Sequence, residues 1–306
     1  MSTNIGFIGV GMMGLPMVQN LIRSGRKVIV CEAAQDRREI AARLAGLQIV
    51  GSPSEVVAHS DVVFTCLPNT DAIRQVYFGP DGICARGGSG KVACELSTTS
   101  PDLSNEVATA LAKNGTKYLE ATMIGPPASA ESAQLYFIVA GEDAVVATVE
   151  PFLRIMGRAF RHVGTIGNAT RAKLLHNALG MIHAVATCEV MALCFQVGVD
   201  PLAFVDIVRQ AAKSRGVGYS TFFDMHAEDI ARGREQGAGR LYIAAKDAHL
   251  AHDLAASVGF DAPLLAEADR TFAAGIAAGL GNLEYTAITR VIEQRMGRKI
   301  FPSSAP

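Results

Sequence analysis

Short apolar runs alternate with amphipathic stretches through the first half of the chain. Runs of this length predict buried strands, and apolar positions three and four apart predict helices between them. The expected strands are Asn4–Ile8, Lys27–Cys31, Gln48–Val50, Asp61–Cys66, Lys91–Leu96 and Lys117–Ala121. The expected helices are Gly14 to about Ser24, Pro53–His59, Thr70–Val76 and Pro101–Lys113. Repeated βα units of this length predict a doubly wound parallel sheet with right-handed crossovers.

The pattern changes at Gly164–Val199, which is apolar on almost every side. A helix with this pattern must be buried all round, so we expect it to lie between domains or subunits. The rest of the chain has helical patterns with Gly-rich joints. We therefore expect an α/β domain over residues 1–163 and an all-α domain over residues 164–306. Burial of such a helix also favours a homodimer or homotetramer.

Three glycines, Gly9, Gly11 and Gly14, follow the first strand in the spacing GxGxxG and lead into a helix. The first permits a tight turn, the second lets a diphosphate approach the backbone, and the third lets the helix pack on the strand. The helix N-terminus supplies amides and a positive dipole end for the phosphates. We expect these glycines, with Met12 and Met13 between them, to bind a dinucleotide.

An acidic residue, Glu32, ends the second strand, where a carboxylate can accept both ribose hydroxyls of adenosine. Ala33 follows, so no arginine stands ready for a 2′-phosphate, which favours NAD over NADP. Leu67-Pro68 and Thr98 follow two further strands at the carboxyl edge, where ligands bind in such sheets. We expect a hydroxyl contact from Thr98 to the cofactor, since Thr99 or Ser100 can cap the next helix instead.

Lys173 and Asn177 lie four apart near the start of the long apolar helix, so they project from one face. One interpretation is a solvated helix start; the other is a functional pair, because a lysine is costly to bury unless its charge is used. His249 and His252, three apart, lack a third ligand at fixed spacing, and we expect no metal site. Lys246-Asp247 is expected to open a later helix, where Asp247 can pair with Lys246 or with Lys173.

The composition describes an ordinary soluble protein: 306 residues, 49% hydrophobic and 19% charged, with a formal net charge of -1. Near-neutrality and the lack of basic runs argue against nucleic acid as a partner. The apolar run Leu174–Cys188 is interrupted by His and Asn and is expected to fall short of a membrane span. Six cysteines without CxxC spacing indicate reduced thiols, and no leader precedes the first strand, so we expect a cytoplasmic protein.

The chain resembles the β-hydroxyacid dehydrogenase family, which includes 3-hydroxyisobutyrate dehydrogenase, over nearly its whole length. The resemblance depends on the segments Gly9–Met17, Glu95–Thr98, Gly164–Gly167 with Lys173 and Asn177, and Lys246-Asp247. It implies a Rossmann N-terminal domain, an all-α C-terminal domain and a long central helix joining them. It also implies NAD or NADP as cosubstrate and a small-molecule substrate. It further implies that Lys173 is the general acid/base, that Asn177 positions the substrate, and that Thr98 and Lys246 contact the cofactor.

The substrate loop departs from the family pattern. Where the family has Asp-Ala-Pro-Val-Ser-Gly-Gly, this chain has Glu120-Ala121-Thr122-Met123-Ile124-Gly125-Pro126. Ile124 replaces the serine, and Pro126 removes a backbone donor. The substrate-binding residues would thus be Thr122, Met123, Ile124, Gly125 and Asn177, with a bulkier or less anionic substrate than usual.

These patterns together predict an NAD(P)-dependent oxidoreductase that transfers hydride between nicotinamide and a hydroxy acid or alcohol, or its aldehyde or ketone. One alternative is an imine reductase, a related class that as a rule lacks the lysine. A second alternative is a nucleotide-binding regulator or scaffold without turnover. The presence of Lys173 argues against both.

Overall fold

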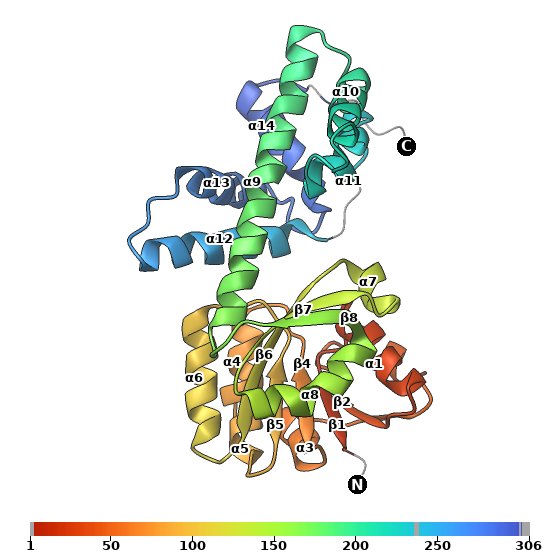
Figure 1. The fold of residues 1–306 in the computed structure, drawn as a ribbon, viewed down its shortest axis with the longest axis vertical. Helices are drawn as coiled ribbons and strands as arrows, with labels where there is room; N and C mark the ends of the chain where they lie inside the picture. The colour runs from red at the N-terminus through yellow and green to blue at the C-terminus, as the bar shows by residue number, and fades with distance from the viewer. Residues whose placement is uncertain (1–2, 236–238, 300, 302–306) are drawn as a thin grey trace. The chain divides into compact units, whose positions relative to one another are not determined.

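The computed structural model describes residues 3–235, 239–299 and 301 (Figure 1). The first compact unit contains one eight-stranded sheet, in the order β3-β2-β1-β4-β5-β6-β7-β8. Its strands are β1 (Ile5–Ile8), β2 (Val28–Cys31), β3 (Leu47–Ile49), β4 (Val62–Thr65), β5 (Val92–Glu95), β6 (Lys117–Ile124), β7 (Leu135–Ala140) and β8 (Gly157–His162). The six expected strands are all present, with β6 three residues longer than expected. This order reverses at β1, so the carboxyl ends of β1 and β4 border a topological switch point.

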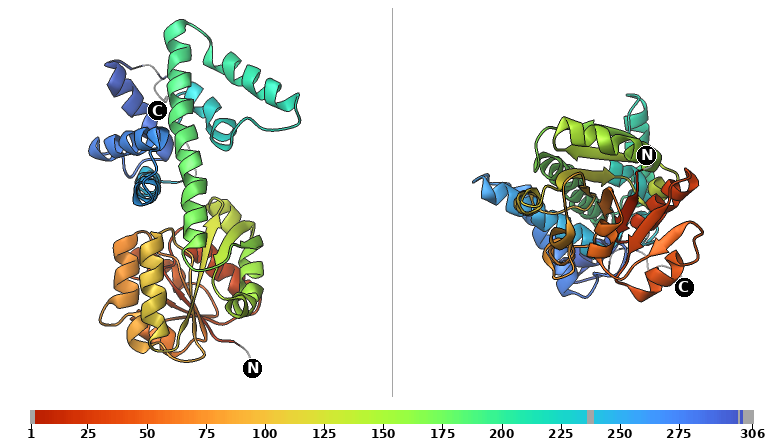
Figure 2. Two further views of the ribbon diagram at one scale, coloured as in Figure 1. Left: turned by 60° about the vertical axis from the view of Figure 1, so that its left-hand side comes forward. Right: turned by 90° about the horizontal axis from the view of Figure 1, so that it is seen from below.

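Helices cover both faces of this sheet, as Figures 1 and 2 show. One face packs on α1 (Gly14–Arg23), α2 (Gln35–Ala41), α7 (Pro127–Glu131) and α8 (Asp143–Met156). The other face packs on α3 (Pro53–Ala58), α4 (Thr70–Phe78), α5 (Ile83–Arg86) and α6 (Pro101–Ala112). In β1, Ile5 and Phe7 belong to the first core and Ile8 to the second. Strands buried on both faces explain the continuous apolar runs in the sequence.

The sheet is not wholly parallel, because β7 pairs antiparallel with β6 while every other neighbouring pair is parallel. The sequence pattern did not predict β7, β8, or α7 and α8 beside them. A parallel neighbour needs a crossover of about a dozen residues or more, whereas antiparallel strands accept a shorter link. The link between β6 and β7 contains only the five-residue helix α7, which suits an antiparallel pair.

The second unit is helical among its described residues. It contains most of α9 (Asn168–Val197), followed by α10 (Pro201–Lys213), α11 (Thr221–Ala231), α12 (Leu241–Ser257), α13 (Pro263–Ala277), the short 3-10 helix η1 (Tyr285–Ile288) and α14 (Thr289–Met296). The expectation that Lys246-Asp247 opens a helix is wrong, since α12 begins at Leu241. The predicted α/β fold with an all-α second domain is confirmed.

The helix α9 forms the core of the second unit through Ala184, Cys188 and Met191, which cluster with α11, α12 and α13. Its length and its mean hydropathy of 1.8 over an 18-residue window are nevertheless sufficient to cross a membrane. The expectation concerned only the shorter run Leu174–Cys188, so this property of the longer helix does not contradict it. The core helix of a soluble protein passes the same test, and the buried face of α9 is of that kind.

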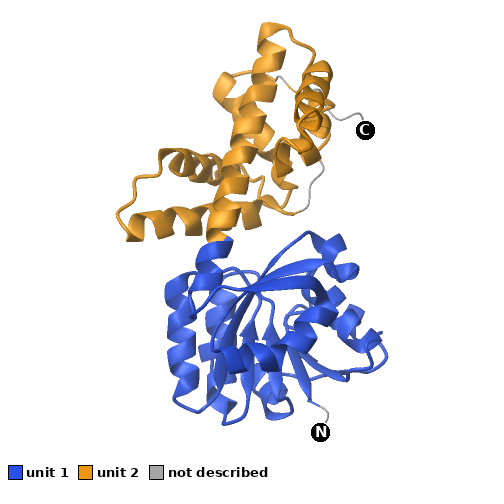
Figure 3. Cartoon of the chain, in the orientation of Figure 1, with its two compact units in different colours: residues 1–173 blue, residues 174–306 orange. Residues whose placement is uncertain are grey.

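The two compact units comprise residues Met1–Lys173 and Leu174–Pro306 (Figure 3). This division falls inside α9, whereas the sequence placed the domain boundary between residues 163 and 164. The difference arises because the first turns of α9 pack on the sheet: Ala169 clusters with Ile138 of β7, and Thr170 bonds to Glu120 of β6.

Candidate active site

The turn between β1 and α1 brings the backbone of the Gly-rich motif close to its neighbours. Gly9 has φ +91, and a Cβ there would overlap the carbonyl of Cys66. A Cβ on Gly14 would overlap the carbonyl of Gly9. A Cβ on Gly11, by contrast, would have no atom within 4 Å. The first and third glycines are thus required by the fold itself, whereas Gly11 leaves open space in which a diphosphate can approach.

The N-terminus of α1 differs from that of three other helices on the sheet. The N-caps of α3, α4 and α6 are Ser52, Asn69 and Ser100, whose side chains accept amide hydrogen bonds. In α1 the N-cap is Met13, and no side chain of the described residues caps it. Met12, just before it, is 41% exposed. Leu15 donates its amide to the Gly11 carbonyl at 3.0 Å and Pro16 has no N–H, so in this first turn it is the Gly14 amide that can meet an anion such as a diphosphate.

Glu32 lies directly after β2 and faces the Gly-rich turn. Its Oε2 accepts the amide of Val10 at 2.6 Å, and its Oε1 accepts the amide of Ala34 at 2.8 Å. Arg38 donates twice to the backbone carbonyl of Glu32, at 2.7 and 3.1 Å. A carboxylate has about four acceptor positions, so two of them remain for ribose hydroxyls. Glu32 thus lies beside the Gly-rich motif, and its contact with the cofactor stays a prediction.

The carboxyl ends of β4 and β5 are joined by a chain of hydrogen bonds. Leu67 donates its amide to Ser97 Oγ at 2.7 Å, and Ser97 donates its amide to Glu95 Oε1 at 2.7 Å. Pro68 and the half-buried Thr98 follow at this same edge. The cap of α6 is Ser100, so capping does not require the Thr98 hydroxyl. Predicted cofactor contacts from two strands are therefore brought to one edge of the sheet.

Burial controls the ionisation of two groups near this edge. It raises the pKa of the Cys66 thiol to about 12, so this cysteine is a neutral thiol at physiological pH. It also raises the pKa of Glu95, which is 1% exposed. A buried carboxyl of this kind favours the neutral form. The Cys66 thiol therefore adds no charge near this edge, and burial disfavours the charge on Glu95.

The predicted substrate loop occupies the end of β6. Thr122 is buried, and its hydroxyl donates to the carbonyls of Ile138 at 3.5 Å and Ala169 at 3.3 Å. Met123 and Ile124 are partly buried and pack on different hydrophobic clusters. Gly125 is exposed with φ +136. The hydroxyl of Thr122 is thus engaged with the backbone, whereas Met123, Ile124 and Gly125 retain accessible surface.

From the sequence, Glu120 was expected only to be part of the substrate loop, but in the structure it bonds to the start of α9. It is 1% exposed. Its Oε2 accepts the amide of Gly167 at 2.8 Å, and its Oε1 accepts the hydroxyl of Thr170 at 2.7 Å. A carboxylate at a helix N-terminus is favoured by the free amides and the dipole. Glu120 therefore anchors the first turn of α9, and Lys173 follows one turn later.

Asn177, Asp247 and Lys246 form a buried polar cluster in the second unit. Asn177 Nδ2 donates to Asp247 Oδ2 at 2.7 Å, and Lys246 Nζ lies 3.0 Å from Asp247 Oδ1. Asn177 and Asp247 are 8% and 7% exposed. Lys173 and Asn177 both belong to α9, four residues apart, as predicted. The structure thus adds Asp247, for which the sequence offered only the possibility of a pairing with Lys246 or Lys173.

His249 and His252 both point to one carboxylate, with Nδ1 atoms 3.3 and 2.9 Å from Asp269 Oδ2. Asp269 lies on α13, and the histidines lie on α12. Within the described ranges, no group of three or more His, Cys, Asp or Glu side chains could hold a metal ion. The two histidines are therefore accounted for by a link between two helices.

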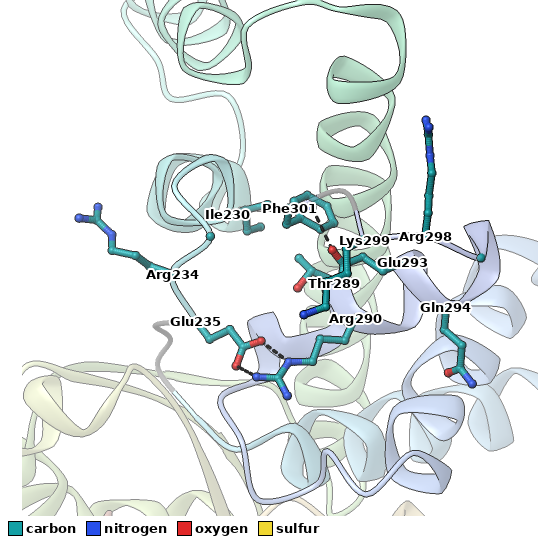
Figure 4. A pocket seen from close by; sticks show the side chains of 12 residues that line it. Ile230, Arg234, Glu235, Thr289, Arg290, Glu293, Gln294, Arg298, Lys299 and Phe301 are labelled. Atoms are coloured by element: carbon teal, nitrogen blue, oxygen red, sulfur yellow. Dashed lines mark hydrogen bonds and ion pairs between the residues drawn. The ribbon is translucent and has the colours of Figure 1, made fainter. Parts of the chain in front are cut away.

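A cavity of about 660 Å³ lies elsewhere in the second unit, near the start of α14 (Figure 4). None of the predicted site residues lines it. Arg290 in its wall makes two hydrogen bonds to Glu235, and Arg234 pairs with Asp229. Two of its arginines are thus already paired with carboxylates, and the predicted chemistry lies in other parts of the molecule.

Together these features define a dinucleotide-binding oxidoreductase fold. Residues 4–167 match the NAD binding domain of 6-phosphogluconate dehydrogenase, and residues 167–292 match the NAD-binding domain of NADP-dependent 3-hydroxyisobutyrate dehydrogenase. The protein belongs to the β-hydroxyacid dehydrogenase family.

Individual relatives cover nearly the whole chain. The 2-(hydroxymethyl)glutarate dehydrogenase of Eubacterium barkeri is 31% identical over 97% of both chains. The mitochondrial 3-hydroxyisobutyrate dehydrogenase of Mus musculus is 32% identical over 83% of this chain and 76% of its own. The solved structure of Mycobacterium tuberculosis 3-hydroxyisobutyrate dehydrogenase with L-serine has a TM-score of 0.82 at 26% identity, covering 95% of this chain and 99% of that one.

The protein is thus an NAD(P)-dependent oxidoreductase that acts on the CH–OH group of hydroxy acids. An imine reductase from Myxococcus stipitatus shares the fold with a TM-score of 0.61, but at 19% identity this likeness concerns the fold alone. The dehydrogenase prediction is confirmed over the imine reductase and over a regulator without turnover. The cofactor class is NAD(P), and the substrate is a small molecule.

Proposed function

We propose that Lys173 is the general acid/base of a hydroxy-acid dehydrogenase, with Asn177 binding the reacting oxygen. The observation that carries this proposal is the position of Asn177: one turn beyond Lys173 on α9, with its amide fixed by Asp247 at 2.7 Å. The nicotinamide, when bound, supplies or accepts the hydride. Lys173 as an amine takes the hydroxyl proton during oxidation, and as an ammonium it returns a proton to the oxygen during reduction.

The dinucleotide fits the residues that surround the β1–α1 turn. The Gly14 amide at the start of α1 and the open space at Gly11 suit the diphosphate. The ends of β4 and β5, with Leu67, Pro68 and Thr98, lie at the carboxyl edge, where such ligands bind. Lys246 is proposed to contact the cofactor from the second unit.

The test of this function is a panel of small hydroxy acids of increasing size, assayed by NADH absorbance with NAD and NADP in parallel. Ile124 and Pro126 favour members that are bulkier or less anionic than the usual 3-hydroxy acid. Lys173→Ala is expected to lower kcat by about 10³-fold, the scale of a lost general acid/base, while NADH still binds by fluorescence titration. Lys213→Ala, at an exposed position on α10, is the matched control. Normal turnover by Lys173→Ala would refute the assignment.

The proposed cofactor is NAD rather than NADP. Glu32 presents a negative carboxylate where a 2′-phosphate would lie, and Arg38 is already bonded to the Glu32 carbonyl. Ala33→Arg adds a cation beside this position without removing the Glu32 contacts. The ratio of kcat/KM for NAD to that for NADP should fall by about tenfold or more, equivalent to about 1.4 kcal/mol. An unchanged ratio in both Ala33→Arg and Glu32→Gln would remove Glu32 from the site.

The proposed assembly is a homodimer or homotetramer in the cytoplasm. Along α9 an outward stripe of large apolar side chains remains exposed, including Val190 at 44%, Leu193 at 56% and Val197 at 65%. A contiguous patch of this kind marks a protein interface. Leu193→Glu should shift the molar mass by light scattering toward the monomer. A monomeric wild-type protein would contradict the assembly but not the chemistry.

A further inference from the structure

Three of the five buried residues of α12 are alanines, and the other two are Leu241 and Asp247. Ala244, Ala248 and Ala251 are all buried, and they cluster with α9 residues such as Ala184 and Ala178. Small side chains let two helices approach closely. Such a close contact leaves little water, so an apolar residue would be expected at the other buried position beside these alanines. That position is Asp247, on the same face as Ala244 and Ala251. A carboxylate in this place therefore needs an explanation.

A buried carboxylate is costly unless hydrogen bonds and an opposite charge compensate it. Asp247 divides its two oxygens between two partners. Oδ2 accepts from Asn177 at 2.7 Å, and Oδ1 faces the Lys246 ammonium at 3.0 Å. Both partners are predicted site residues, and Asn177 lies 70 positions before Asp247 in the chain. The carboxylate thus connects the two groups of the second unit that the proposed reaction uses.

The chemistry of a carboxylate determines how the Asn177 amide is turned. An ionised carboxylate only accepts hydrogen bonds, so the nitrogen of Asn177 must face Asp247. The carbonyl of that amide then faces His176, whose Nδ1 is 3.1 Å from Asn177 Oδ1. The nitrogen carries a second N–H, which is a donor.

We propose that Asp247 is a positioning residue that orients the Asn177 amide so that its second N–H binds the reacting oxygen of the substrate. The same carboxylate holds the Lys246 ammonium in place for the cofactor. The inference depends on the proposed roles of Asn177 and Lys246. It predicts that activity requires Asn177 to donate its hydrogen bond to Asp247. An enzyme in which position 247 donates to position 177 should be inactive.

Asp247→Asn tests this direction, because an amide of nearly the same size can both donate and accept. The helix contact survives, and the melting temperature should change little, but the Asn177 amide is free to turn over. We expect kcat to fall about tenfold and KM for NAD to rise severalfold as Lys246 loses its counter-charge. Asp247→Glu keeps the carboxylate and should be the more active of the two. Asp253→Asn, an exposed position of α12, is the matched control.

The double variant Asn177→Asp with Asp247→Asn reverses the pair. It retains a carboxylate–amide hydrogen bond between the same helices, so the packing is kept while position 177 loses the N–H donor that the proposal needs. We expect it to be folded and at least 100-fold less active than the wild type. Wild-type kcat and KM in a folded Asp247→Asn, or wild-type activity in the reversed pair, would overturn the proposal.

A second measurement does not require turnover. In protein labelled with ¹⁵N-asparagine, the NMR signal of the Asn177 side-chain amide is identified as the one that disappears from the spectrum of Asn177→Asp. The wild type should show one orientation with one N–H protected from solvent exchange, and Asp247→Asn should lose this protection or show two orientations. Equal protection in both would overturn the inference. Absence of turnover by the wild type on the hydroxy-acid panel would instead refute the proposed function, and the amide signals would still decide the role of Asp247.

Discussion

The two units stabilise their buried polar groups in different ways. In the first unit, Glu32, Glu95 and Glu120 are carboxylates in or directly after strands, and each accepts a backbone amide. In the second unit, buried polar side chains bond to one another across helices. Asn177 bonds to Asp247, and Tyr285 OH lies 3.0 Å from His226 Nε2.

This difference shows how each unit builds its part of the site. Amides at strand ends and helix starts have positions set by the backbone, so the first unit depends on turn geometry and on glycine. Helices have few free amides along their length, so the second unit must recognise ligands with side chains. Substitutions should therefore act through steric overlap in the first unit and through hydrogen-bond chemistry in the second.

The largest effect is expected from adding a methyl group to the Gly-rich turn. Gly14→Ala should lower the free energy of unfolding by about 3 kcal/mol, because the new Cβ overlaps a backbone carbonyl that cannot move cheaply. Gly11→Ala should leave stability nearly unchanged, yet weaken NADH binding about tenfold or more, because the methyl group occupies the path of the diphosphate. Denaturant unfolding and NADH fluorescence titration separate the two effects.

Gly88→Ala serves as the control for this pair, since a Cβ there also meets no atom within 4 Å and the position lies outside the Gly-rich motif. Its stability and NADH affinity should both match the wild type. Tight NADH binding by Gly11→Ala would contradict the backbone recognition of the diphosphate.

A smaller effect is expected at the buried carboxyl of the first unit. Burial raises the pKa of Glu95 above its ordinary value of 4.5. The folded state then keeps a proton that the unfolded chain releases, so stability falls as the pH rises from about 4.5 through the folded-state pKa. Glu95→Gln keeps an acceptor for the Ser97 amide and should stabilise the protein by about 1 kcal/mol at pH 8. Thermal unfolding across pH 4 to 8 measures this, and a variant less stable than wild type at pH 8 would contradict it.

The smallest effect, of the opposite sign, is expected at His226 in the second unit. Burial lowers the pKa of His226 below 6.5, so the unfolded chain binds a proton that the folded state does not. The contribution of neutral His226 to the free energy of unfolding is present above pH 6.5 and is lost as the pH falls through the folded-state pKa. His226→Gln can still bond Tyr285, and should remove part of the loss of stability between pH 7 and pH 5. The exposed His59→Gln is the control. Equal pH dependence in all three proteins would exclude this role.

Much of the first unit could be predicted because its signals are local. The GxGxxG motif, the carboxylate after β2 and the strand ends at Leu67 and Thr98 are each specified within a few residues. Parallel pairing then brings these strand ends to one edge of the sheet. The antiparallel β7 was missed because residues 125–163 lack such a motif, and a buried strand and a buried helix have similar apolar runs.

The sequence by itself determined the six parallel strands β1 to β6, the dinucleotide motif, and the helical relation of Lys173 to Asn177, because each depends on backbone geometry over a short span. Only the tertiary structure decided that Glu120 anchors the start of α9 and that Asp247 meets Asn177. Glu120 and Gly167 are 47 positions apart, and Asn177 and Asp247 are 70 positions apart. Each contact joins a carboxylate to an amide. Their energy comes from excluding water around both partners, and that exclusion exists only after the chain has packed.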